Sequence, residues 1–215
     1  MNSELNVLVF GSTGTLGSSI VRQFLLNGCS VSSGPRELEE LTSDYVFDSV
    51  IWAQGVNETK SLTDSNIENE LRVFDANYFF VTKSLRLLVS KNILSSNARL
   101  VILGSIWSDL GKKNKSSYAA SKAAVTSLIR GLIQEDEFKN IAINVVSPGI
   151  VDSKMTRQNL NKLQIESIQN ETPGRKIVTS DEVSKVVYFL ASVESKGING
   201  QNIVVDNGWS ATRNV

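Results

Sequence analysis

The chain has 215 residues, which suits one domain with a substantial hydrophobic core. Its 22 basic and 22 acidic side chains balance, so the overall charge gives no reason to expect a nucleic-acid or anionic-membrane partner. The sequence has no histidine and one cysteine, Cys29, which excludes histidine-based triads and an internal disulfide and argues against a metal site such as zinc. Without a signal-peptide pattern or an apolar run of ~20 residues, we expect a soluble, cytoplasmic protein with no membrane partner.

The first 28 residues have the pattern of the first half of a dinucleotide-binding unit. A valine-rich run at 5–10 predicts a buried parallel strand, and apolar residues between Ile20 and Leu25 predict a helix that ends at Asn27-Gly28. Between them lies a glycine-rich turn whose backbone N–H groups suit a pyrophosphate. Its candidate contacts are Gly11, Ser12, Thr13, Gly14, Thr15, Leu16 and Gly17. The alternative is that the three glycines only make a turn.

The region that follows is short for a dinucleotide fold. Residues 29–33 predict a weak second strand, residues 36–42 a short helix and residues 48–53 the next buried strand. An ordinary fold of this kind inserts a complete helix and a further strand here, so we expect it to be shortened around the second and third strands. Where NAD-preferring sites carry an acid, this chain has Ser33 and Arg36, which favour the 2′-phosphate of NADP. The alternative for Arg36 is a solvated charge at a helix start.

The rest of the chain alternates helices and strands. Apolar periodicity predicts helices at about 66–91, 116–134 and 179–191, and strands at 100–103, 141–146 and 200–205. Residues 153–172 are polar and weakly helical, and we expect them to form a lid or binding loop. Together these elements predict one α/β domain over residues 1–215, with a doubly wound, Rossmann-like fold around a parallel sheet.

The stretch from Ser105 to Lys122 carries residue types suited to proton transfer. Tyr118 and Lys122 stand at i and i+4 of a predicted helix, so their side chains share one face. A lysine cation beside a phenol lowers the phenol pKa toward the neutral range, and the Ser105 hydroxyl can hold a carbonyl oxygen against the phenol. The alternative is a surface helix that carries a tyrosine and a lysine. Asn77 lies among apolar residues of the 66–91 helix, so its amide needs local backbone bonds or a water chain.

Taken in order, these motifs resemble those of the short-chain dehydrogenase/reductase family along the whole chain. The resemblance rests on the glycines of residues 11–17, Ala53-Gln54-Gly55, Asn77, Ser105, the Tyr118-Ala-Ala-Ser-Lys122 motif, the 147–153 segment and the ending GQNIVVDNGW. It implies an NAD(P)(H)-dependent oxidoreductase that reduces a small-molecule carbonyl or oxidises a secondary alcohol. The cofactor would be NADP or NAD, with NADP slightly favoured.

The resemblance also implies roles for single residues. Tyr118 would be the general acid or base, and Lys122 would lower its pKa and bind the nicotinamide ribose. Ser105 would position the substrate oxygen, and Asn77 would hold a water linked to Lys122. Further cofactor contacts would be Ala53, Gln54, Gly55, Tyr118, Lys122, Pro148, Gly149, Ile150, Val151 and Ser153. Members of the family usually form homodimers or homotetramers through two long helices, here at 66–91 and 116–134, and the last strand.

Three departures from the family pattern keep other functions open. The glycine spacing is G-x-x-G-x-x-G, Ala53-Gln54-Gly55 replaces the usual end of Asn-Asn-Ala-Gly, and the adenosine side is shortened. A non-catalytic relative that senses nucleotides or acts as a scaffold is therefore the main alternative. A sugar-nucleotide epimerase or dehydratase ranks last, because it needs a further substrate domain. Lys112, Lys113 and Lys115 lie near the expected site and would attract an anionic substrate, although a solvated loop explains them as well.

Overall fold

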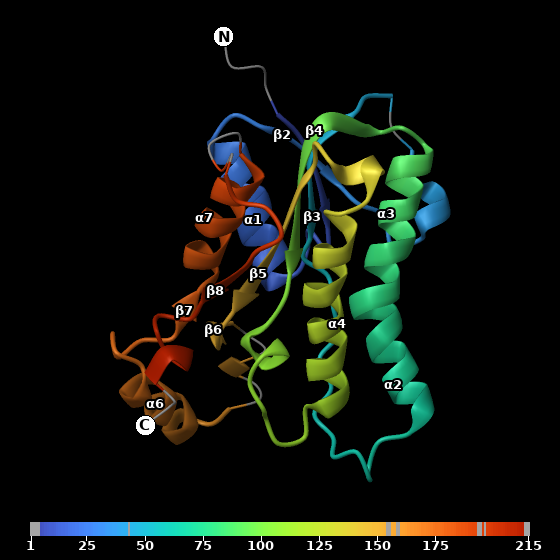
Figure 1. The fold of residues 1–215 in the computed structure, drawn as a ribbon. Coiled ribbons are helices and arrows are strands. Elements are labelled where there is room, and N and C mark those ends of the chain that lie inside the picture. The colour runs from blue at the N-terminus through green and yellow to red at the C-terminus, as the bar shows by residue number, and fades with distance from the viewer. Residues whose placement is uncertain are drawn as a thin grey trace.

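The computed structural model describes residues 5–42, 44–153, 156–157, 160–192, 195 and 197–212. A parallel sheet forms the middle layer; helices α1 and α7 cover one face, and α2, α3 and α4 cover the other (Figure 1). Within these described residues the sheet has six strands in the order β2-β1-β3-β4-β5-β8. The predicted doubly wound α/β fold with a parallel sheet is therefore confirmed. That all of residues 1–215 belong to one domain stays a prediction.

The strands and helices lie close to their expected positions. The strands are β1 (Asn6–Phe10), β2 (Ser30–Ser33), β3 (Phe47–Trp52), β4 (Leu94–Leu103), β5 (Ala142–Pro148), β6 (Val151–Asp152), β7 (Val178–Thr179) and β8 (Asn202–Val205). The helices are α1 (Thr15–Leu26), α2 (Ile67–Phe74), α3 (Phe80–Ser90), α4 (Ser116–Leu132), α6 (Lys162–Glu171) and α7 (Ser180–Ala191). Short 3₁₀ turns are η1 (Leu38–Glu40), η3 (Ile106–Ser108), η4 (Asp136–Phe138) and η6 (Ser210–Thr212). Strand β4 begins earlier than expected, and its pairing with β3 is irregular between Phe47 and Ser49.

The central strands are apolar on both faces because helices cover both. Successive residues of a strand point to opposite faces, so β1 divides its side chains between two cores. Leu8 and Phe10 join the core under α3 and α4, whereas Val7 and Val9 join the core under α1 and α7. This double burial explains why the strands read as continuous apolar runs.

The shortened region is compact, and its sequence explains how the sheet stays covered. Strand β2 is the edge strand, and the helix expected over 36–42 is reduced to the single turn η1. Residues at i and i+3 of a 3₁₀ turn point the same way. Leu38 and Leu41 therefore both reach the core under α3, where Leu41 is fully buried. Lys91 Nζ donates to the carbonyl oxygen of Leu41 at 2.6 Å and so fixes the segment that follows η1 to the end of α3.

The predicted 66–91 helix is confirmed with one interruption. A π-helical turn, η2 (Asp75–Phe79), joins α2 to α3, and Asn77 lies at its centre. Such turns insert an extra residue into an α-helix and often mark functional sites. In the described part of the chain, no helix is long and apolar enough to cross a membrane.

Candidate active site

The carboxyl ends of the parallel strands bring the predicted site residues to one edge of the sheet. Phe10 pairs with Trp52, Trp52 with Ile102, and Leu103 with Val146, so the loops after β1, β3, β4 and β5 start side by side. These loops carry the glycine-rich turn, Gly55, Ser105 and Gly149. Open α/β sheets bind ligands at this edge.

Two glycines make the first turn possible. Gly11 has φ = 74°, and a β-carbon there would stand 2.5 Å from the backbone nitrogen of Gln54. A β-carbon at Gly17 would stand 2.0 Å from the carbonyl oxygen of Gly11. The turn is therefore packed tightly against the start of α1 and against the loop after β3. Gly14 precedes α1 as its N-cap, and only Gly11 lies near its β-position, so the outer side of the turn stays open.

Ser105 and Tyr118 meet although thirteen positions separate them. Ser105 is buried, and its hydroxyl acts on the Tyr118 phenol, whose pKa it lowers. Ser105 Oγ also accepts the backbone N–H of Trp107 at 3.3 Å, which turns the chain into η3. Because the oxygen accepts this bond, the hydroxyl proton of Ser105 is available to a second acceptor.

Burial controls the proton affinity of both Tyr118 and Lys122. Burial raises the pKa of the Tyr118 phenol above its usual value, and the hydrogen bond with Ser105 opposes this shift. Burial lowers the pKa of Lys122 to about 8. Lys122 Nζ donates to the carbonyl oxygen of Leu103 at 2.8 Å. Desolvation of the phenol is the largest effect on the Tyr118 pKa, and the expectation that Lys122 lowers this pKa stays a prediction.

Asn77 connects the loop after β3 to helix α4. Its Oδ1 accepts the N–H of Val56 at 2.8 Å, and its Nδ2 donates to the carbonyl of Val56 at 3.0 Å and to Ser121 Oγ at 2.9 Å. The buried amide is thus satisfied by local bonds, the first of the two options that the sequence left open. Ser121 donates to the carbonyl oxygen of Tyr118 at 2.7 Å, so Asn77 is linked through one hydroxyl to the backbone of the α4 residue that carries the phenol.

Gln54 and Ser33 lie near the glycine-rich turn, and Arg36 follows Ser33 by three positions. Gln54 Oε1 is buried and has no hydrogen-bond partner among the described residues, so it can accept a bond from a bound group. Ser33 is exposed at the end of β2, and the following N–H of Gly34 donates to Val9 at 2.9 Å. The exposed guanidinium of Arg36 has no ion-pair or hydrogen-bond partner in the described ranges.

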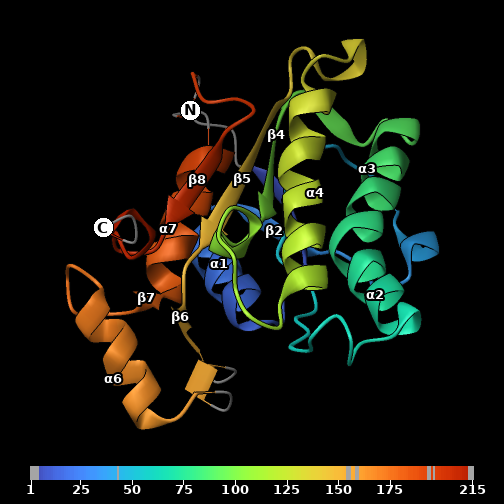
Figure 2. The ribbon, with the colours of Figure 1, turned by 60° about the horizontal axis from the view of Figure 1, so that its bottom comes forward.

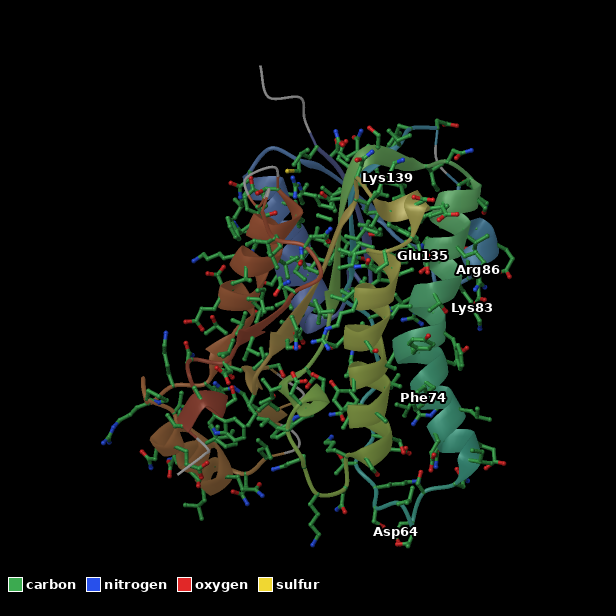
Figure 3. All side chains as sticks on the ribbon, in the orientation of Figure 1. Asp64, Phe74, Lys83, Arg86, Glu135 and Lys139 are labelled. Carbon is green, nitrogen blue, oxygen red and sulfur yellow. The ribbon has the colours of Figure 1, made fainter. Side chains whose placement is uncertain are left out.

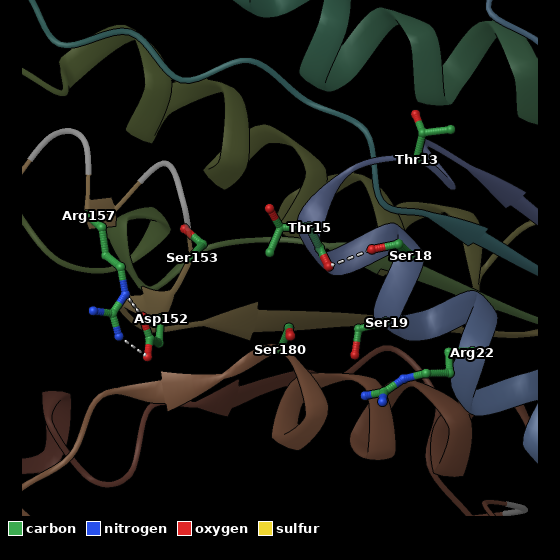
Figure 4. A pocket seen from close by; sticks show the side chains of 9 residues that line it. All are labelled: Thr13, Thr15, Ser18, Ser19, Arg22, Asp152, Ser153, Arg157 and Ser180. Atoms are coloured by element: carbon green, nitrogen blue, oxygen red, sulfur yellow. Dashed lines mark hydrogen bonds and ion pairs between the residues drawn. The ribbon is translucent and has the colours of Figure 1, made fainter.

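A cavity of about 700 Å³ opens between the starts of α1 and α7 (Figure 4). Its lining residues are mostly hydroxyl-bearing or charged: Thr13, Thr15, Ser18, Ser19, Arg22, Asp152, Ser153, Arg157 and Ser180. The sequence pointed to Thr13, Thr15 and Ser153 and missed the others, which come together only through folding. Arg157 and Asp152 form a bidentate ion pair, in which Nε lies 2.7 Å from Oδ1 and Nη2 lies 2.8 Å from Oδ2. These lining groups make the cavity a polar one.

The 147–153 segment is placed by a small second sheet that the sequence did not predict. Pro148 ends β5, and a β-carbon on Gly149 would stand 2.6 Å from that of Asp206. Ile150 accepts the N–H of Val178 at 3.2 Å, and Val151 pairs with Val178 in the β6–β7 sheet. The segment therefore runs from the main sheet to the cavity wall. Ser153 Oγ there accepts the N–H of Thr156 at 3.1 Å.

The expected lid over residues 153–172 is partly outside the described residues, which exclude 154–155 and 158–159. Helix α6 forms its second half and lies beyond the β6–β7 sheet, away from the main sheet (Figure 2). A capping box between Asn161 and Gln164 starts this helix. Leu163 on its first turn is 76% exposed, so an apolar side chain of α6 is free to contact another group.

Comparisons with known proteins agree with this arrangement. Residues 39–210 match the family model described as enoyl-(acyl carrier protein) reductase. The 3-oxoacyl-[acyl-carrier-protein] reductase FabG of Buchnera aphidicola subsp. Schizaphis graminum is 30% identical over 172 residues, which are 78% of this chain and 68% of that protein. The crystal structure of a short chain dehydrogenase family protein from Francisella tularensis superposes with a TM-score of 0.87 at 23% identity, covering 97% of this chain and 100% of that one.

A second solved structure, ElxO with NADP bound, has a TM-score of 0.81 at 23% identity and covers 97% of this chain and 100% of that one. At this identity, the two solved structures are evidence for the fold alone. The family model and the FabG relative extend the agreement to the sequence, over most of the chain. This chain is therefore a member of the short-chain dehydrogenase/reductase family of oxidoreductases.

Proposed function

We propose that this protein is an NAD(P)(H)-dependent oxidoreductase that reduces a carbonyl or oxidises a secondary alcohol, using Tyr118, Lys122, Ser105 and Asn77. One observation carries the proposal: buried Lys122, one helical turn after Tyr118, donates to the carbonyl oxygen of Leu103 at 2.8 Å, two positions before buried Ser105. The loop after β4, the π-helical turn η2 and helix α4 supply these residues next to the loop after β3. A surface helix with an incidental tyrosine would not place these groups together.

The protonation states suit a reductase. A tyrosine has an ordinary pKa of 10.0, and burial raises that of Tyr118 further, so the phenol is protonated at neutral pH and can give its proton to a carbonyl oxygen. Ser105 donates its free hydroxyl proton to the same oxygen and holds it against the phenol. Lys122 stabilises the negative charge that develops on Tyr118, in a buried setting where such interactions are strong. In the oxidation direction the same groups act in reverse.

The residues around the glycine-rich turn fit a dinucleotide. The turn leaves its outer side open at Gly14, the buried Gln54 Oε1 lacks a partner among described residues, and the cavity presents Thr13, Thr15 and Ser153. The bound NADP or NAD would carry the hydride. The remaining contacts would come from Gly11, Ser12, Leu16, Gly17, Ala53, Gly55, Pro148, Gly149, Ile150 and Val151. ElxO, a structural neighbour, holds NADP.

NADP is slightly favoured over NAD by Arg36. Its guanidinium is exposed shortly after the end of β2, where the 2′-phosphate of the adenosine ribose would lie. No carboxylate among the described residues forms an ion pair with it. Ser33 adds a hydroxyl to the same edge. The two residues would replace the acidic side chain of NAD-preferring sites.

The substrate is a small carbonyl or alcohol compound in this proposal, and two aromatic residues would contact it. Trp107 follows Ser105, and its ring meets the ring of Trp209 edge to face at a centroid distance of 5.6 Å. Trp209 is buried, so packing fixes its contact with Trp107, two positions after Ser105. The 3-oxoacyl group named in the FabG relative is one carbonyl class to test.

We also propose a homodimer or homotetramer that uses the outer faces of α2, α3 and α4. Ile67, Leu71 and Phe79 are exposed along α2 and η2. Figure 3 shows the same helical column with Phe74, Lys83 and Arg86 along it, and Lys83 pairs with Asp75 at 2.8 Å. The mixture of apolar and charged groups suits a helix-to-helix interface.

A non-catalytic relative remains the second candidate because β2 is the edge of the described sheet. A further strand beyond β2 would help to form the adenosine side. Titration of the protein with NADPH and with NADH, followed by tryptophan emission, separates the two functions. Saturable micromolar binding supports the oxidoreductase, and a screen of carbonyl substrates then tests turnover. No binding of either cofactor at millimolar concentration would favour the non-catalytic relative.

Tyr118→Phe tests the mechanism itself. The variant keeps the ring and loses the proton, so kcat should fall by at least about 10²-fold while cofactor affinity stays within about threefold. Activity close to that of the unmodified protein would contradict the role assigned to Tyr118.

A further inference from the structure

Lys115 lies just before α4 and makes contacts that no motif predicts. Its Nζ donates to Asn57 Oδ1 and, at 2.5 Å, to Thr59 Oγ1, so it ties the loop after β3 to the start of α4. The same Nζ lies 5.5 Å from the centroid of the Tyr118 ring, within the range of a cation–π contact. One ammonium group therefore touches both the loop and the ring that carries the reacting phenol.

The loop is held at a second point by Asn77. Asn77 bonds both backbone groups of Val56, and a β-carbon at Gly55 would stand 2.8 Å from Asn77 Oδ1. Residues 55–59 are thus fixed between η2 and the start of α4. Asn77 holds the end next to Lys122, and Lys115 holds the end next to Tyr118.

No carboxylate among the described residues compensates the charge of Lys115. Its acceptors there, Asn57 Oδ1 and Thr59 Oγ1, are neutral oxygens, and within the same residues it forms no ion pair. Burial, and then the nearby charge of Lys112, lower the pKa of its half-buried ammonium. Lys113, two positions away, is exposed, so a lysine in this loop does not need to lie against the tyrosine. The inward placement of Lys115 costs free energy that a solvated lysine avoids.

We propose that Lys115 is a positioning residue for Tyr118. It holds the phenol ring and the 55–59 loop in one arrangement, so that the phenol, Ser105 and Lys122 stay aligned for proton transfer. It acts through Tyr118 and does not touch the reacting atoms. This inference rests on the proposed oxidoreductase function.

Three variants test the proposal: Lys115→Met removes the charge and the donors, Lys115→Arg keeps both, and Lys139→Met is the control at an exposed lysine that the site does not use. We expect Lys115→Met to lower kcat about tenfold and to change KM and cofactor Kd less than about threefold, because misalignment affects the reacting geometry most. Lys115→Arg should recover kcat to within about threefold, and Lys139→Met should match the unmodified protein. A kcat within twofold of normal in Lys115→Met, or an equal loss in Lys139→Met, would overturn the proposal.

A double-mutant cycle tests whether Lys115 acts through the loop. Asn57→Ala together with Thr59→Ala removes its acceptors, and adding Lys115→Met should then cause less than half of the loss, on a logarithmic scale, that it causes alone. Full additivity would show that Lys115 acts without the loop.

Amide hydrogen exchange of residues 55–60 needs no substrate and separates this inference from the proposed function. We expect exchange there to be about tenfold faster in Lys115→Met than in Lys139→Met, because the bonds of Lys115 to Asn57 and Thr59 protect these amides. If exchange is faster in Lys115→Met but the unmodified protein shows no turnover, the loop contacts of Lys115 are supported and the proposed oxidoreductase function is contradicted. Unchanged exchange in Lys115→Met would overturn the proposal that Lys115 holds the 55–59 loop.

Discussion

The backbone of Gly55 lies against the side chain of Asn77, since a β-carbon at position 55 would stand 2.8 Å from Asn77 Oδ1. The same β-carbon would be 3.4 Å from Lys122 Nζ. The glycine after β3 is therefore needed because two buried polar side chains of the site occupy the space that any larger residue would require.

Gly55→Ala should displace the Asn77 amide from Val56 and lower cofactor affinity and kcat by about tenfold or more, with a loss of stability of about 1–3 kcal/mol. Gly111→Ala is the control, because nothing lies within 4 Å of its β-position. Cofactor titration and urea unfolding measure the two effects. Wild-type affinity and stability in Gly55→Ala would show that the loop can move away from Asn77 at no cost.

The stability of the protein should depend on the titration of Lys122. Burial lowers the pKa of this lysine from 10.5 to about 8, so the unfolded state binds more protons than the folded state between these values. The unfolding free energy contributed by Lys122 should therefore rise with pH, by about 1 kcal/mol between about pH 7 and pH 9. Urea unfolding of the unmodified protein and of Lys122→Met measures the difference. Parallel pH profiles of the two proteins would refute the lowered pKa.

Arg36→Ala should weaken NADPH binding by about tenfold and NADH binding by less than about threefold, since only NADPH carries the 2′-phosphate. Arg86→Ala, on the outer face of α3 (Figure 3), is the matched loss of an arginine away from the site. Fluorescence titration with both cofactors gives the two ratios. Equal losses for NADPH and NADH would place Arg36 outside the phosphate site.

Leu41→Ala tests how the shortened region replaces a missing helix. Leu41 is 2% exposed in the core under α3, so its truncation should cost about 2–5 kcal/mol of unfolding free energy. Leu26→Ala, at a side chain that is 75% exposed, should change it by less than about 0.5 kcal/mol. Urea unfolding compares the two. Similar small losses in both variants would mean that the η1 segment is not part of the core.

Local patterns of residues predicted most of the fold. The apolar strands, the glycine-rich turn and the Tyr118–Lys122 spacing each depend on neighbouring residues, so they are visible without a structure. The structure of the 36–42 segment was not predicted correctly from its local pattern. Residues 36–42 have a helical pattern, but the structure has one 3₁₀ turn there because Leu38 and Leu41 both reach the same core. Tertiary burial outweighed local helix preference there.

By itself, the sequence determined the parallel α/β class, the shortened adenosine side and the residue types of the candidate site. The tertiary structure alone decided which distant groups meet: Arg22 and Arg157 at one cavity, Lys115 on Asn57 and Tyr118, and Asn77 on Val56. It also set the direction of the Tyr118 pKa, because desolvation depends on everything packed around the phenol. Spacing along the chain reports neighbours within one element, whereas contacts between elements and loss of solvent arise only when the sheet brings its loops to one edge.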